Sequence, residues 1–186
     1  MLTIALAIEE NENRRKNDRL DVGMLAAMAL VHDMGEIIEG DTAYFIKMAH
    51  GRPEDEDELM AFCRIAEPLP DAAQKYLIGA MLQTMRGSKD YVDTKEARFF
   101  EAVENISALK RSLHECRLGN LHFAPKCLDW AIAALKQHAR KFPSPIRLYK
   151  PHIAEARTYL KEFEKQKDKY IAEFVKRGGK AEGFPF

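Results

Sequence analysis

One short segment of the chain carries several side chains of the kinds that bind metal ions. Residues 29–41 read ALVHDMGEIIEGD, so that His32 and Asp33 are adjacent and, at helical spacing, Glu36 lies one turn beyond His32 on the same face. Transition metals accept imidazole nitrogen and carboxylate oxygen, and an uncoordinated carboxylate nearby can take a proton from water. The spacing therefore indicates metal-assisted hydrolysis, with Asp41 completing the site from the loop after Gly40.

The His-Asp pair taken alone is a weak signal, because a chain with six histidines has an appreciable chance of containing one. In the alternative interpretation His32 is a satisfied core histidine, and Asp33 and Glu36 are solvated or cap a helix end. The surroundings favour the metal site, since an apolar run leads into the pair and further acids follow before the Gly-Asp step. The other histidines have no acid at ligand spacing and are left out of the site: His50, His114, His122, His138 and His152.

Helical periodicity predicts the elements that position this segment. Apolar residues recur at helical spacing from Leu20 to Val31, and we expect Asn17 or Asp18 to cap this helix and the helix to end near Gly40. The acidic run after Pro53 is interpreted as the first turn of a helix and not as a metal cage. Proline and glycine breakers separate further helices, predicted at 53–66, 70–86, 93–117, 123–141 and 146–177, and no alternating pattern predicts strands.

Composition limits the class of protein. A chain of 186 residues suits one domain, and its 29 basic and 29 acidic side chains balance, so neither polymeric nucleic acid nor an anionic membrane is an expected partner. The cysteines, Cys63, Cys116 and Cys127, are odd in number and form no Cys-x-x-Cys motif, which is typical of a reducing compartment. No apolar run approaches the roughly 20 residues of a membrane span. We expect a soluble cytoplasmic protein.

The pattern His32-Asp33-x-x-Glu36 followed by Gly40-Asp41 resembles the HD-domain metal-dependent phosphohydrolases, specifically their deoxyribonucleoside 5′-monophosphatase branch. A second stretch, TKEARFFEAVE at 94–104, is similar to the family's later helix, where Glu-Ala-x-Phe leads to the aspartate that closes the metal site. The resemblance runs in order from about residue 1 to about residue 115. It implies an all-α HD-domain helical bundle, here a single domain over 1–177 with a long C-terminal helix and a flexible tail at 178–186.

The resemblance also implies a set of site residues. In the family two histidines and two aspartates hold one divalent cation, so that by matching position His32 and Asp33 are ligands, while Glu36 and Asp41 are the catalytic acid/base and water-positioning pair. The last ligand aspartate falls at Glu104, whose side chain is longer by one methylene, about 1.5 Å, and we expect weaker binding there. The implied reaction is hydrolysis of a phosphomonoester, a (deoxy)nucleoside 5′-monophosphate, by a homodimer that uses Mn, Co, Fe, Ni, Zn or Mg.

The start of the chain departs from the family pattern, because no histidine precedes His32. Residues 1–8 are almost entirely apolar, lack a capping residue and align with the middle of the family's opening helix. We therefore expect the native protein to begin upstream, with a histidine within about six residues before Met1, one to two helical turns. For the chain as it stands we expect weak or no activity. The alternative is a catalytically lapsed HD-fold binding or scaffold protein.

Overall fold

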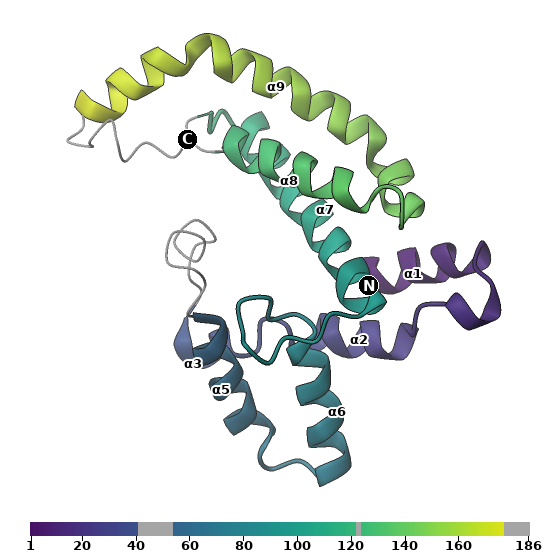
Figure 1. Cartoon of the computed structure of the whole chain (residues 1–186). Helices are drawn as coiled ribbons and strands as arrows, with labels where there is room; N and C mark the ends of the chain where they lie inside the picture. Colours follow the sequence, from purple (N-terminus) through teal and green to yellow (C-terminus); the bar gives the residue numbers. More distant parts are fainter. Residues whose placement is uncertain (41–53, 122–123, 177–186) are drawn as a thin grey trace. The chain divides into compact units, whose positions relative to one another are not determined.

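The computed structural model describes residues 1–40, 54–121 and 124–176 (Figure 1). Within these ranges the chain forms eight α-helices and one short 3-10 helix, and no strand occurs there. The all-α prediction with a long C-terminal helix is confirmed. The chain divides into two compact units, residues 1–101 and 102–186, and the boundary falls inside helix α7 (Lys95–Arg117). The single domain over 1–177 stays a prediction, and the tail at 178–186 lies outside the described residues.

The first unit is built around α2 (Val22–Val31), whose residues are all apolar or glycine. Helices α1 (Leu2–Glu12) and α6 (Asp71–Leu82) both pack against α2, while α5 (Glu54–Ala66) contacts α6 and the short α3 (Glu36–Glu39). A helix that is apolar all round must be covered on several sides to remove its side chains from water. The resulting core includes these fully buried side chains: Leu25, Met28, Val31, Phe62, Met81 and Phe99.

The start of α2 differs from the sequence prediction. The predicted caps, Asn17 and Asp18, belong instead to a 3-10 helix at Lys16–Asp18, and the helix begins later with Asp21 as its N-cap. The carboxylate of Asp21 accepts a hydrogen bond from the backbone N–H of Met24 at 3.0 Å. The backbone N–H of Asp21 in turn donates to Glu96 of α7 at 2.9 Å. The capping residue thus also takes part in a contact between residues far apart in the sequence.

The second unit contains the rest of α7 together with α8 (Ala124–His138) and α9 (Pro143–Lys176). Helices α8 and α9 pack against each other. Between α7 and α9, Nε and Nη2 of Arg117 donate to the two carboxylate oxygens of Glu155 at 2.8 and 2.6 Å. The buried side chains of this unit include Ile106, Leu109, Leu113, Leu128, Leu135 and Ala156.

Helix α9 runs for 34 residues and begins at Pro143, so that Pro143 and Pro145 lie in its first turn and do not separate two helices as predicted. The N–H groups of a first turn have no intrahelical acceptor, so proline costs little there. Pro151 lies inside the helix, where it cannot donate a backbone hydrogen bond, and Figure 1 shows α9 as curved. No helix among residues 1–40, 54–121 and 124–176 is long and apolar enough to cross a membrane.

Candidate metal centre

His32 and Asp33 follow directly on the last residue of α2. The backbone N–H of His32 still makes a helical bond, to the carbonyl of Met28 at 3.0 Å, and the chain then turns through residues 32–35, where the N–H of Met34 donates to the carbonyl of Val31 at 2.9 Å. The imidazole Nε2 of His32 lies 3.1 Å from Oδ2 of Asp33. The side chain of His32 is 25% exposed and that of Asp33 is 65% exposed, so both donor atoms belong to side chains that solvent reaches.

The ring of His32 packs edge-on against Phe100 of α7, with ring centroids 5.3 Å apart and an interplanar angle of 74°. Phe100 is buried in the core of the first unit next to Phe99. Edge-to-face pairs of this kind prefer a defined geometry. Phe100 therefore restricts the orientation of the imidazole. Phe100 belongs to residues 94–104, so this segment of resemblance contacts the His-Asp pair.

Gly35 lets the turn after the pair lie directly against α5. A Cβ atom built on Gly35 would lie 2.3 Å from the carbonyl oxygen of Glu58 and 2.8 Å from its carbonyl carbon. These are backbone atoms and cannot move aside as the end of a side chain could. Glu36, half-buried, is the first residue of α3, and Gly40, which has a φ of +84°, follows Glu39, the last residue of that helix. The helix predicted to continue to near Gly40 is thus interrupted at 32–35.

Two buried acids of α5 were not recognised from the sequence. The acidic run after Pro53 does begin a helix, as predicted, yet Asp55 and Glu58 are buried. Asp55 accepts a hydrogen bond from the backbone N–H of Gly87 at 2.6 Å. Nearby, Glu56 accepts one from the N–H of Lys89 at 2.8 Å, and this bond lowers the pKa of the Glu56 carboxyl. These acids hold the loop that leads to α7.

A signal for the buried acids exists in the sequence. The two acids share helical spacing with other buried residues of α5, among them Leu59, Phe62 and Ala66. The charge of the run indicates a helix start, whereas its positions on the apolar face of the helix indicate that these two carboxylates are buried.

The structure brings together two of the residues predicted for the site, His32 and Asp33. Glu104 lies on the part of α7 within the second unit and is exposed, and Asp41 lies outside the described residues. In the part of the chain that the structure describes, no group of three or more His, Cys, Asp or Glu side chains is arranged to hold a metal. The pair itself fits a metal, because two neighbouring donors of a six-coordinate ion with bonds of about 2.1 Å lie about 3 Å apart.

Comparison with known proteins identifies the family. No curated protein and no solved structure matches the chain. The family model described as HD domain matches residues 1–130, which is more than half of the chain and includes both segments of resemblance, 29–41 and 94–104. Proteins of this family are in general metal-dependent phosphohydrolases that bind divalent cations and act on phosphate esters. We conclude that the chain belongs to the HD domain family.

Proposed function

We propose that the chain is a phosphohydrolase that uses one divalent cation to hydrolyse a small phosphomonoester, with a (deoxy)nucleoside 5′-monophosphate as the substrate class. The observation that carries the proposal is the His32 Nε2–Asp33 Oδ2 separation of 3.1 Å within a chain of the HD domain family. The family as a whole supports hydrolysis, in which water accepts the phosphoryl group, over transfer of that group to another acceptor. The nucleotide class rests on the resemblance of the motif to the 5′-monophosphatase branch.

In this proposal His32 and Asp33 hold the cation, and Phe100 and Gly35 act as positioning residues for the imidazole and for the turn. When bound, the cation supplies Lewis acidity toward a phosphoryl oxygen. Glu36 stands four residues after His32 at the start of α3 and handles the proton of the attacking water, together with Asp41. On the resemblance alone, Glu104 stands at the position of the family's last ligand and remains a proposed ligand.

The experiment is a hydrolysis assay of the purified chain with a panel of substrates and metals. Ribo- and deoxyribonucleoside 5′-monophosphates, a sugar phosphate and p-nitrophenyl phosphate are each incubated with Mn, Co, Fe, Ni, Zn or Mg, and with a chelator. The double variant His32→Ala/Asp33→Ala serves as the control for contaminating phosphatase. We expect phosphate release that requires metal and is absent in the double variant. Equal release by both proteins would overturn the proposal.

A second candidate function is a catalytically lapsed HD-fold binding or scaffold protein. It is favoured by the absence of a third ligand beside His32 and Asp33 among the described residues. Metal content separates the two candidates. If the dialysed protein retains well under a tenth of an equivalent of any of the six metals, and added metal does not raise its melting temperature, the lapsed form is supported.

We also propose that the protein forms a homodimer. The proposal rests on the family resemblance and on the apolar stripe of α9, which is long relative to the helix α8 that packs on it. Light scattering at micromolar concentration tests it. The mass of a 21.3 kDa monomer under these conditions would contradict it.

A further inference from the structure

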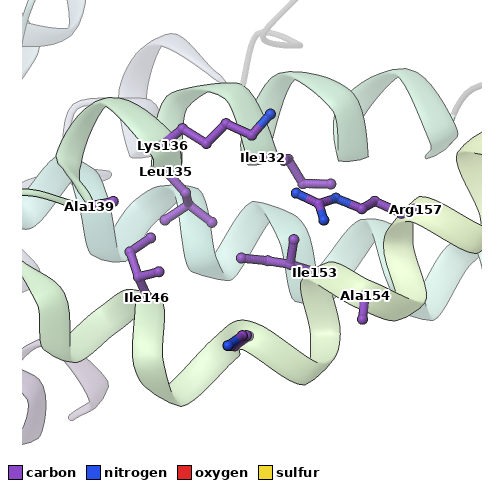
Figure 2. A pocket seen from close by; sticks show the side chains of 9 residues that line it. Ile132, Leu135, Lys136, Ala139, Ile146, Ile153, Ala154 and Arg157 are labelled. Atoms are coloured by element: carbon purple, nitrogen blue, oxygen red, sulfur yellow. The ribbon is translucent and has the colours of Figure 1, made fainter.

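A groove of about 400 Å³ lies between α8 and α9 in the second unit (Figure 2). This volume lies within the range of about 300–1,000 Å³ that is typical of small-molecule sites. The groove is formed by residues beyond 130, so the family match does not account for it. Its lining consists of Ile132, Leu135, Lys136, Ala139, Ile146, Lys150, Ile153, Ala154 and Arg157.

The walls of the groove are aliphatic. Ile132 and Leu135 of α8 are buried, and Ile146 and Ile153 of α9 lie across from them (Figure 2). Among the described residues, the lining offers no aromatic ring on which a base could stack and no side-chain hydroxyl or amide group to match a sugar. A nucleotide is therefore a poor fit, and an apolar chain is a good one.

The same groove carries three cations, Lys136, Lys150 and Arg157. All three are exposed, and none forms an ion pair with a carboxylate within residues 1–40, 54–121 and 124–176. Figure 2 shows Lys136 running along α8 and Arg157 extending from α9 toward Ile132. Further along α9, by contrast, Lys165 pairs with Glu162. The chain as a whole has no net charge, so this cluster is a local excess of positive charge beside apolar walls.

We propose that the α8–α9 groove binds a small amphipathic carboxylate, with its aliphatic chain between Leu135 and Ile153 and its carboxylate at the three cations. Residues 146 to 157 extend over about 16 Å of helix. A chain of about eight to ten carbons, roughly 10–12 Å long with bonds of about 1.5 Å, matches this length. Burial of the chain supplies the attraction, and the cations select an anion over a neutral molecule.

The test uses the full chain and decanoate, with decan-1-ol as the neutral probe of equal chain length. Isothermal titration calorimetry gives the affinity, and backbone amide shifts measured by NMR locate the bound chain. We expect a dissociation constant of about 50 µM to 1 mM for decanoate, given the binding energy typical of about twelve heavy atoms. We expect decan-1-ol to bind about tenfold more weakly.

Variants separate the contributions of charge and of the walls. The double variant Lys150→Gln/Arg157→Gln should weaken decanoate binding by about tenfold and leave decan-1-ol unchanged. Lys161→Gln is the matched control, since Lys161 is an exposed cation of the same helix that does not line the groove. Ala154→Trp should block both probes by filling the groove. All four positions are exposed, and circular dichroism verifies that each variant remains folded.

Three outcomes would overturn the proposal. One is equal affinity for the two probes, which would make the groove a nonspecific apolar surface. Another is unchanged decanoate affinity in Lys150→Gln/Arg157→Gln, and Lys136→Gln repeats this test from α8. The third is self-association that Ala154→Trp abolishes, seen by light scattering without any decanoate binding, which would assign the groove to a second copy of the chain.

Discussion

Nε2 of His32 lies 3.1 Å from Oδ2 of Asp33, although consecutive side chains of a continuous α-helix point about 100° apart. Both residues belong to the turn that follows Val31, the last residue of α2. Phe100 packs on the imidazole and Gly35 holds the turn against α5. These contacts fix the imidazole ring and the turn, and with them the position of the two donor atoms.

Asp33→Ala should remove metal binding, because the pair loses its anionic donor. We expect the affinity to fall by more than the roughly 10–100-fold that is typical when a residue outside the ligand shell is lost. Metal content by mass spectrometry and the melting temperature with added Mn or Co measure the effect. Asp57→Ala, at an exposed position of α5, is the control and should behave as the unaltered protein. Unchanged stoichiometry in Asp33→Ala would remove Asp33 from the site.

Glu36→Gln should lower the turnover number by about 100-fold or more and leave metal binding nearly intact. An amide keeps the size of the carboxyl but cannot accept a proton. Parallel measurements of kcat and of metal affinity distinguish a proton-transfer group from a ligand. If both quantities fall together, Glu36 is a metal ligand and the assignment of its role is wrong.

Gly35→Ala should destabilise the fold by about 1–3 kcal/mol, because the new Cβ would lie 2.3 Å from the Glu58 carbonyl oxygen and the two backbones must separate. Gly79→Ala is the matched control. It lies inside α6, and a Cβ there meets no atom within 4 Å, so this change should stabilise the protein by about 0.5–1 kcal/mol. Urea unfolding measures the change in the free energy of unfolding in each variant, which should have opposite signs. Similar small effects in both would show that α3 and α5 are not in close contact.

Burial raises the pKa of the Cys116 thiol from its ordinary value of 9.0 to about 11, with a smaller contribution from Cys127. The folded state therefore favours the neutral thiol, and this contribution to stability is fully present below pH 9 and is lost as the pH rises through about 11. At pH 10.5 the loss is at most about 2 kcal/mol. We expect unfolding free energies of the unaltered protein to fall more steeply between pH 8 and 10.5 than those of Cys116→Ala. Parallel curves would contradict the raised pKa.

The sequence by itself determined where most helices lie and which family motif the chain carries. The predicted helices at 53–66 and 93–117 correspond to Glu54–Ala66 and Lys95–Arg117, because periodicity and breakers act within a few residues. His32 and Asp33 were identified in the same way, since their neighbours in the chain define the motif.

Only the tertiary structure decided the features that depend on distant residues. Asp21 caps α2 while it is held by Glu96, a residue 75 positions away. Asp55 is buried because it binds the backbone of Gly87, 32 positions along the chain. The groove, whose three cations have no ion-pair partner among the described residues, exists only because α8 and α9 pack together. In each case the free energy that stabilises the feature comes from contact with a residue or helix that is distant in the sequence. Local sequence patterns do not identify that partner, and only the fold places it nearby.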